Sequence, residues 1–439
     1  MDDILASRIL ASIEADRLVA FCGAGLSMAS PSDVPGVAGL FATCVPKYEQ
    51  IIGMQLPAHA KASLEELAKY ALGRHELPQI FIHRVIDWYR FIRNPNKGHR
   101  AIADLLACKA LCAGVTTNVD PLVEQAATDL GEPHLFAALD GNEASVSCPH
   151  APFLKLHGCC NREKDNTVWC KEQLDEDPLK RRIKASKDWM AGNLLTKDII
   201  FVGFWSDWSY LNSIFEDCIA TFQPGFIVLV DPNDQANLET KAPGLWGLAH
   251  RNEFFHVQES GAVFFDELRR RFSKKFLDEL VRDSITSYQG LTGNVAAAPV
   301  SFDLTSNSED LYALRRDACG EPIGQIPRLK RPDRVMNIVG VAHQFLVQNG
   351  GSLTGASYNI ASKTVRVVLG SGQALSRVEA KFEAEPTTPL SPEVVICAGA
   401  FPDAAPVNIL RGSPPPTVVR AGSRSKWVTF DQAKTELGL

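Results

Sequence analysis

Residues 18–27 read Leu18-Val19-Ala20-Phe21-Cys22-Gly23-Ala24-Gly25-Leu26-Ser27. Five apolar residues in a row predict a short strand buried on both faces, as in a parallel sheet. Gly23 and Gly25 follow directly, and two glycines one residue apart allow a tight turn that a ligand can approach closely. A helix that begins at or just after Ser27 would point its free N–H groups at the same spot, which suits a diphosphate. The stretch therefore predicts either a nucleotide-binding loop or a plain structural turn.

Strand-like runs alternate with helical segments over the first 280 residues. The apolar runs are 111–117, 135–139, 153–156, 198–204, 225–231 and 253–257, and helical patterns lie at 3–16, near 120–130, and at 207–221 and 261–281. This alternation predicts a doubly wound parallel sheet of the Rossmann-like α/β class. The region from about 31 to 100 shows helical patterns without a strand, which predicts a helical insertion over the glycine turn.

Length and composition indicate more than one domain. The chain has 439 residues, of which 45% are hydrophobic and 22% charged, ordinary for a folded protein but too long for one core. We expect a first domain over 1–285, a linker over 286–320 and a small α+β domain over 321–439. In the last domain we expect a helix over 332–349 and strands over 364–369 and 378–384.

Charge and cysteine usage narrow the functional classes. The net charge is −6, while residues 321–439 alone hold 13 Lys+Arg against 9 Asp+Glu. An acidic body argues against direct nucleic-acid binding by the first domain. No apolar run reaches membrane-spanning length, and Met1-Asp2-Asp3 lacks the basic start of a signal peptide. Eleven cysteines without a disulfide framework fit a reducing compartment, so we expect a cytoplasmic protein.

Polar residues follow the second buried run. Thr117, Asn118 and Asp120 stand at its end, where open α/β sheets bind their ligands. Asn118 and Asp120 offer an amide and a carboxylate with little bulk around them. Asp120 precedes Pro121, so a helix cap is the alternative role for its carboxylate, and this role does not exclude catalysis by Asn118.

A histidine closes the apolar run 153–156. His157 follows Phe153-Leu154-Lys155-Leu156 and precedes Gly158, which places it at the same edge of the predicted sheet. A lone histidine there is often structural. Together with an amide and a glycine turn at equivalent strand ends, it favours a general base.

Jointly, these stretches resemble the motifs of the Sir2 (sirtuin-like) family. Gly23-Ala24-Gly25-Leu26-Ser27 resembles the family's Gly-Ala-Gly-x-Ser loop. Thr116-Thr117-Asn118-Val119-Asp120 resembles its Thr-x-Asn-x-Asp motif, and Leu156-His157-Gly158 resembles its His-Gly motif. Residues 95–103 are similar to its Pro-Asn-x-x-His helix start, and Gly203 with Ser206 and Asp207 to a later nucleotide-contacting turn. Asp231 stands where an acidic group holds ribose hydroxyls. The resemblance covers residues 1 to about 280.

The resemblance implies that NAD⁺ is bound and that its nicotinamide–ribose bond is cleaved. Nicotinamide leaves from a pyridinium, so neither an acid nor a metal is needed, whereas an oxocarbenium-like ribose must be stabilised and an attacking group oriented. By this resemblance the catalytic residues are Asn118, which orients ribose and water, His157, which is the base, and Asp120. The implied cofactor-binding residues are Gly23, Ala24, Gly25, Ser27, Thr117, Gly203, Ser206, Asp207 and Asp231.

The attacking nucleophile separates the functions within the family. Its protein deacylases use an acyl-lysine oxygen and carry a zinc module of two Cys-x-x-Cys pairs. Here the nearby cysteines are Cys148, Cys159, Cys160 and Cys170, with no such pair, so we expect no metal and keep an irregular zinc site as the alternative. Residues 31–37 also lack the deacylases' Asp-Phe-Arg run, and Phe204-Trp205 is bulkier than the Thr-Ser of those relatives.

The Thr-Thr-Asn form looks more like bacterial Sir2-like NAD⁺ hydrolases of antiphage defence, in which water attacks. We therefore expect an NAD⁺ glycohydrolase that yields nicotinamide and ADP-ribose and depletes NAD⁺ when triggered. The resemblance implies a regulatory or assembly role for residues 321–439, a homo-oligomer, or a separate sensor such as an Argonaute-like protein, a translocase or a signal molecule. An NAD⁺-dependent protein deacylase and a non-catalytic module that binds NAD⁺ or ADP-ribose are the alternatives.

Overall fold

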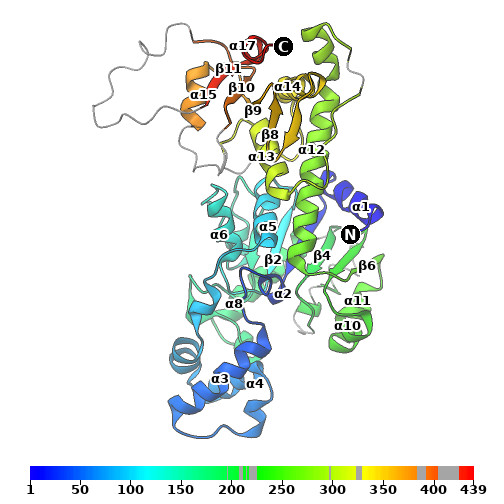
Figure 1. Cartoon of the computed structure of the whole chain (residues 1–439). Coiled ribbons are helices and arrows are strands. Elements are labelled where there is room, and N and C mark those ends of the chain that lie inside the picture. The colour runs from blue at the N-terminus through cyan, green and yellow to red at the C-terminus, as the bar shows by residue number, and fades with distance from the viewer. Residues whose placement is uncertain are drawn as a thin grey trace, which may run out of the picture. The chain divides into compact units, whose positions relative to one another are not determined.

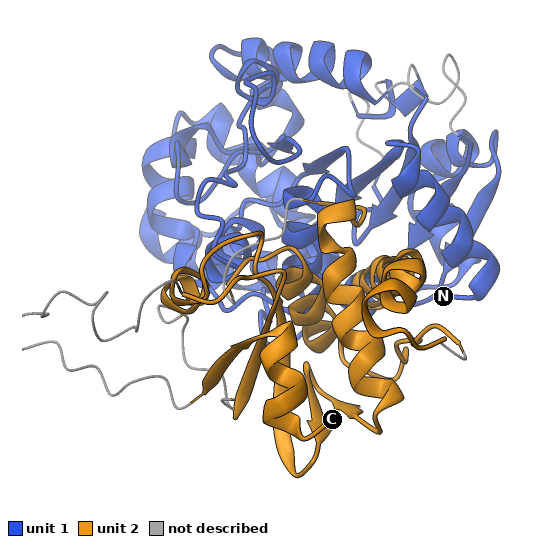
Figure 2. Ribbon diagram, turned by 90° about the horizontal axis from the view of Figure 1, so that it is seen from above, with its two compact units in different colours: residues 1–266 blue, residues 267–439 orange. Residues whose placement is uncertain are grey.

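The computed structural model describes residues 1–194, 196–206, 211–213, 215–216, 225–295, 298–322, 329–382, 392–403 and 425–439. These residues form two compact units, Met1–Asp266 and Glu267–Leu439, shown in blue and orange in Figure 2. The units divide earlier than the expected boundary at 285, which falls inside helix α12 (Gly261–Thr292). Part of the expected linker is helix α13 (Ser308–Ala318), because Leu311 and Leu314 pack in the core of the second unit.

The first unit alternates strands and helices, as labelled in Figure 1. Its strands are β1 (Leu18–Cys22), β2 (Ala113–Thr116), β3 (Phe153–Lys155), β4 (Asp198–Val202), β5 (Ile227–Val230) and β6 (Phe254–Val257). Its helices are α1 (Asp3–Glu14), α2 (Ala24–Ser27), α3 (Val37–Ile52), α4 (Leu64–Gly73), α5 (Lys97–Ala107), α6 (Leu122–Asp129), α7 (Gly141–Ala144), α8 (Leu179–Asn193), α10 (Gln235–Lys241), α11 (Pro243–Ala249) and the start of α12. Short helical turns are η1 (Ala58–Lys61), η2 (Leu77–Val85), η3 (Trp88–Phe91), η4 (Lys164–Asn166) and η5 (Lys171–Asp175).

The strands of the first unit form one parallel sheet. Within the described residues it has six strands in the order β3-β2-β1-β4-β5-β6, and every described pair is parallel. The doubly wound prediction is therefore confirmed. The order reverses between β1 and β4, and the crevice at the carboxyl ends of such a pair is where Rossmann-like sheets bind ligands.

One predicted strand of the first unit is wrong. In the run 135–139 only Ala138 bridges to Leu154 of β3. The chain turns away after that bridge, because the Asp140 side chain accepts a hydrogen bond from Glu143 N and starts α7. Most of the helix expected over 207–221 lies outside the described residues.

The sheet is packed on both faces. On one face, residues at alternate strand positions such as Phe21, Phe201 and Leu229 share a core with Trp189 of α8 and Leu245 of α11. On the other face the packing is close enough to require glycine, since a Cβ on Gly261 at the start of α12 would lie 2.2 Å from Val202 Cγ2.

The insertion expected over residues 31–100 has its own small core. Tyr48, Leu67, Phe81 and Trp88 are among the buried residues that pack together there. Figure 1 shows α3 and α4 gathered away from the strands of the sheet. The segment Leu77–Val85, expected to be regular helix, is a wider π-helix that begins with Pro78 in its first turn.

The second unit has a mixed sheet in the order β11-β10-β9-β8-β7. Its strands are β7 (Ser352–Thr354), β8 (Ser357–Ile360), β9 (Lys363–Leu369), β10 (Val394–Ala398) and β11 (Lys426–Thr429), and its helices are the rest of α12, α13, η6 (Arg334–Met336), α14 (Asn337–Gln348), α15 (Leu375–Phe382) and α17 (Phe430–Leu437). The strand predicted over 378–384 is wrong for residues 378–382, which belong to α15, while 383 and 384 lie outside the described residues. Val378 and Phe382 lie four residues apart, which suits one face of a helix, and both are buried in one small core. Among the described helices, none is both long and apolar enough to cross a membrane.

Candidate active site

The carboxyl edge of the first sheet is marked by residues that pair in register. From β3 to β6 these are Lys155, Thr116, Cys22, Val202, Val230 and Val257. The predicted site residues follow this row directly: residues 23–27 after β1, residues 117–120 after β2, His157 after β3, Gly203 after β4 and Asp231 after β5. The sheet therefore gathers residues that are distant in sequence along one edge, on both sides of the β1–β4 reversal.

The glycine loop packs backbone against backbone. Gly25 N donates to Gly203 O at 2.9 Å, and Gly203 has a φ of +60°. A Cβ on Gly23 would lie 2.6 Å from Gly203 O, and one on Gly203 would lie 2.4 Å from Leu26 N. Helix α2 begins at Ala24 rather than at or after Ser27, because Leu26 N bonds to Gly23 O and closes the turn at once. The glycines thus have a structural role here, besides any contact with a ligand.

Ser27 is the centre of a buried hydrogen-bond network. Its side chain is 0% exposed, and its Oγ lies 3.0 Å from His99 Nε2, 2.9 Å from Asp120 Oδ2 and 3.2 Å from Asn118 Nδ2. The Asn118 amide nitrogen also donates to Gly23 O at 3.1 Å. Because both N–H groups of this amide donate to the glycine loop, its orientation is fixed, and its carboxamide oxygen is the group left to accept a bond from a ligand.

The partners of His99 define its protonation state. Asn96 N donates to His99 Nδ1 at 3.1 Å, so this nitrogen carries no proton and Nε2–H donates to Ser27. The Asn96 side chain caps α5 and donates to Leu26 O, which holds the glycine loop against the helix. Burial, and secondarily the Lys155 charge, lowers the pKa of His99 to about 3. His99 is therefore neutral at pH 7.

Each oxygen of the Asp120 carboxylate accepts a hydrogen bond. Its Oδ1 accepts a 3.3 Å bond from Leu122 N at the start of α6, and its Oδ2 accepts the Ser27 hydroxyl. Burial raises the pKa of this carboxyl, while Lys155 and the Ser27 hydrogen bond act in the opposite direction. Asp120 is 6% exposed, so in this structure it supports the network and does not face a ligand.

His157 lies at the same edge and is nearly buried, at 8% exposed. Gly158 after it has a φ of +87°, which turns the chain away from β3. Burial, and then the nearby Arg182, lowers the pKa of His157 to about 3. The imidazole is thus neutral and able to accept a proton, but it is a weak base until a neighbouring negative charge raises its pKa.

The remaining predicted cofactor-binding residues lie in different surroundings. Asp231 follows β5, and its Oδ1 accepts bonds from Asn233 N and Nδ2 at 2.9 and 2.7 Å. Thr117 and Ser206 are half-buried. Asp207 lies outside the described residues.

Three residues of the site were not assigned a role from the sequence. Asn96 and His99 belong to a helix start that resembled a family motif, but only the fold shows that they bind the Ser27 loop. Lys155 is 1% exposed, and its Nζ donates to Asp120 O at 2.5 Å. A lysine inside the apolar run 153–156 was the signal that could have identified it.

The cysteines near the site do not form a recognisable metal centre. Cys159, Cys160 and Cys170 are buried, and Cys148 is half-exposed. Across the described ranges, no three His, Cys, Asp or Glu side chains are grouped so that they could hold a metal ion.

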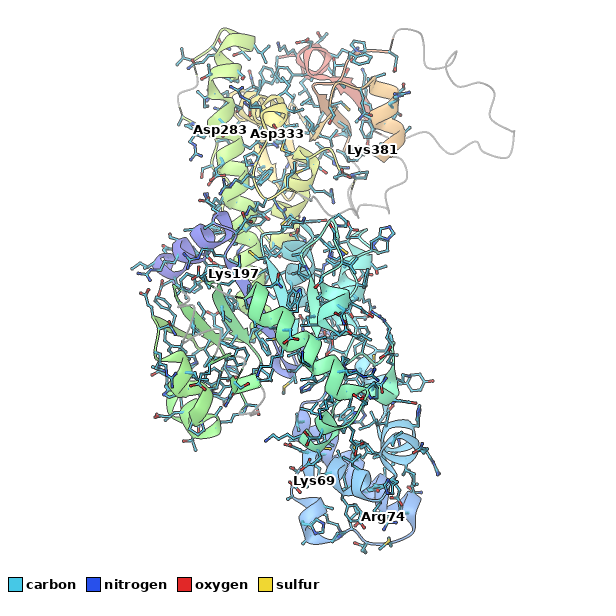
Figure 3. All side chains as sticks on the ribbon, turned by 180° about the vertical axis from the view of Figure 1, so that it is seen from behind. Lys69, Arg74, Lys197, Asp283, Asp333 and Lys381 are labelled. Carbon is cyan, nitrogen blue, oxygen red and sulfur yellow. The ribbon has the colours of Figure 1, made fainter. Side chains whose placement is uncertain are left out.

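Two surface cavities of the first unit lie away from these residues. One of about 380 Å³ is lined by Cys112, Pro152 and Lys197 among others, which lie just before β2, β3 and β4 at the amino edge of the sheet. Lys197 is labelled in Figure 3. The other, of about 470 Å³, lies between α7 and α8. Neither contains a predicted site residue.

Acidification should destabilise the fold below about pH 6.5. His99 and His157 bind protons near pH 3 when folded but near pH 6.5 when unfolded, so between these values the unfolded chain binds more protons. Each histidine should therefore remove roughly 1.4 kcal/mol of unfolding free energy per pH unit in that range. Asp120, whose pKa is raised, acts in the opposite direction at lower pH.

Urea denaturation at pH 7.5, 6.5 and 5.5 checks this expectation. The midpoint should fall at pH 5.5 in the native chain and fall less in His99→Asn. His59→Gln, at an exposed histidine, is the control. A midpoint that stays constant over this range would show that the two histidines are not held neutral by burial.

Part of this chain is similar to known proteins. Residues 113–246 match the model of the SIR2-like domain. Two curated proteins named NAD(+) hydrolase ThsA are similar: that of Acinetobacter baumannii (strain 532279) is 25% identical over 209 residues, 46% of this chain and 39% of its own length, and that of Cytobacillus dafuensis is 26% identical over 207 residues, 46% and 38%. The match thus spans about two fifths of the length of these relatives.

Solved structures of Sir2 homologues are also similar to part of this chain. A Sir2 homologue in complex with ADP-ribose has a TM-score of 0.35 and 19% identity, covering 61% of this chain and 95% of that one. A Sir2 homologue–NAD complex has a TM-score of 0.31 and 18% identity, covering 61% and 92%. The match to the SIR2-like domain model extends from β2 to α11 of this chain.

Proposed function

We propose that this chain is an NAD⁺ glycohydrolase that cleaves the nicotinamide–ribose bond with water. The observation that carries the proposal is the fixed amide of Asn118. Its two N–H groups donate to Gly23 O and Ser27 Oγ, so its carboxamide oxygen is held at the sheet reversal, next to the glycine loop. An acceptor in that position can orient a ribose hydroxyl or a water for attack at the anomeric carbon.

The neighbouring groups suit the two ends of NAD⁺. The Gly23–Gly25 turn would receive the diphosphate, and Asp231 would receive ribose hydroxyls on its carboxylate. Nicotinamide needs no acid to leave, because it departs as a neutral base from a pyridinium. His157 would take the proton of the attacking water, and the negative diphosphate nearby would raise the pKa of His157 from its low value.

Water, rather than an acyl-lysine, is the proposed nucleophile. The named relatives are NAD(+) hydrolases, and the sequence has no Cys-x-x-Cys pair of the kind that deacylases use for zinc. We further propose that the protein is a cytoplasmic antiphage effector whose second unit, Glu267–Leu439, controls activity or assembly, either in a homo-oligomer or with a separate sensor.

The test is a reaction series with purified full chain. NAD⁺ is supplied alone, with an acetyl-lysine peptide, and each with extract from phage-infected cells as a source of the trigger. We expect nicotinamide and ADP-ribose in equal amounts without peptide, no acetylated ADP-ribose with it, and unchanged rates in a zinc chelator. Peptide-dependent nicotinamide release would establish the deacylase instead, and ADP-ribose binding without turnover in any arm would establish the non-catalytic module.

A further inference from the structure

Lys155 is a buried lysine at the end of β3 and makes three polar contacts. Its Nζ lies 2.6 Å from Glu124 Oε1 on α6, 2.5 Å from Asp120 O and 3.4 Å from Cys159 Sγ. One ammonium group therefore joins the segment that carries Asn118 and Asp120 to the segment that follows His157.

Fold stability does not account for a lysine here. Phe153 and Leu154 precede it in a strand that is buried throughout, where an apolar residue of similar length would pack well. A buried ion pair commonly adds little stability over such a residue, because taking both charges out of water offsets their attraction. The charge at this position thus calls for another explanation.

We propose that Lys155 is a positioning residue that holds the Ser27 network in its working charge state, with Asp120 ionised and His99 neutral. The cation attracts a carboxylate and repels an imidazolium, so it favours these two states together. The proposal deepens the proposed NAD⁺ hydrolysis, because it is this network that fixes the Asn118 amide.

The hydrogen bonds show why these states matter. A proton on His99 Nδ1 would face the Asn96 N–H that now donates to it at 3.1 Å, and would break that bond at the start of α5. A proton on Asp120 would weaken the acceptor of the Ser27 hydroxyl at 2.9 Å. The first change would loosen the start of α5, whose Asn96 side chain holds the glycine loop through Leu26 O, and the second would weaken the bond that Ser27 donates to Asp120. Both changes would disturb the loop groups that orient Asn118.

The other titratable side chains in this cluster are those of Glu124, Cys159 and Cys22. Glu124 from α6 balances its charge. The Cys160 hydrogen bond and the Lys155 charge together favour the thiolate of Cys159, while burial opposes it. Burial, and then the Asp120 charge, raises the pKa of the Cys22 thiol at the end of β1, so Cys22 stays neutral. Within the described contacts of this cluster, Lys155 is the cation, Glu124 is the carboxylate paired with it, and Asp120 contributes its backbone oxygen.

The sharpest variant removes the charge without leaving Glu124 as an unpaired carboxylate. In Lys155→Met/Glu124→Gln both charges are absent, so the fold should persist. The control is Arg17→Met, which breaks an ion pair with the buried Asp198 at the opposite, amino edge of the same sheet. Urea midpoints of both variants report any general loss of stability.

The direct readout does not depend on activity. His99 is followed by NMR in full chain labelled at histidine, with His99→Asn used to assign its signal. We expect a neutral imidazole down to the acid unfolding limit in the native chain and in Arg17→Met. In the double variant its titration should move to higher pH. A His99 signal that titrates identically in all three proteins would overturn the proposal, whether or not the chain hydrolyses NAD⁺.

Activity gives the second readout. In the double variant kcat at pH 7 should fall on the order of tenfold to a hundredfold with little change in KM, and the acid limb of the pH profile should move to higher pH. Lys155→Arg, which keeps the charge, should restore part of kcat. A native pH profile in the double variant would contradict the proposal. Absence of NAD⁺ turnover in the native chain would instead count against the proposed function, and the NMR comparison would still decide the role of Lys155.

Discussion

Replacing His157 with alanine is expected to lower nicotinamide release by roughly 10²–10⁴-fold, the usual contribution of a general base. The imidazole is neutral at pH 7, because burial and Arg182 lower its pKa to about 3. It is therefore able to accept a proton from water once the substrate's diphosphate has raised its pKa. The measurement is the rate of nicotinamide formation from NAD⁺ under conditions in which the native chain is active.

A control variant and a binding measurement show whether this loss of rate comes from loss of the base. His59→Ala, at an exposed histidine of the insertion, should keep the native rate. Calorimetric titration with ADP-ribose should give nearly native affinity in His157→Ala, because in the proposed mechanism His157 acts on the water and not on the diphosphate. Full turnover by His157→Ala would remove His157 from the mechanism and leave Asn118 as the principal catalytic side chain.

Gly203→Ala is expected to destabilise the first unit by roughly 3 kcal/mol or more. Gly203 has a φ of +60°, which is costly for any residue with a side chain, and the new Cβ would lie 2.4 Å from Leu26 N. Relief would require the two turns to separate, which would break the 2.9 Å bond from Gly25 N to Gly203 O. Urea denaturation of the full chain measures the effect.

Gly192→Ala is the matched control for this substitution. Gly192 lies in the exposed part of α8, and a Cβ added there would have no atom within 4 Å, so alanine should leave stability unchanged or raise it by up to about 1 kcal/mol. Equal midpoints for the two variants would show that the β1 and β4 turns do not pack as closely as described.

The sequence allowed much of the first unit to be predicted because its strands are continuous apolar runs. Residues 18–22, 198–204 and 225–231 are all at or near observed strands, and polar residues directly after such runs must lie at the carboxyl edge of a parallel sheet. Two predicted strands were wrong where the spacing of the apolar residues fits both a strand and a helix. Residues 135–139 form a single bridge, and 378–382 are helical, because one or two apolar side chains fit a strand or a helix equally well.

The network behind the site could not be derived from local sequence. Ser27 and Asp120 are 93 residues apart in the chain, and His99 lies between them in the sequence. The fold brings the three residues together at the ends of β1 and β2 and at the start of α5. The role of Lys155 depends on partners from α6 and the segment after β3, which no spacing within its own strand reveals. The division between the two units at Asp266 lies inside α12, which continues without a break across it, so the helical pattern does not mark that position.

A crystal structure of the full chain with ADP-ribose tests the central claim most directly, because it locates the ligand. If the proposed site is right, the diphosphate lies against Gly23–Gly25 and a ribose lies within hydrogen-bond distance of the Asn118 carboxamide oxygen. The Ser27 bonds to His99 and Asp120 should stay intact. ADP-ribose bound elsewhere, such as in the cavity beside Lys197 at the amino edge of the sheet, would contradict it.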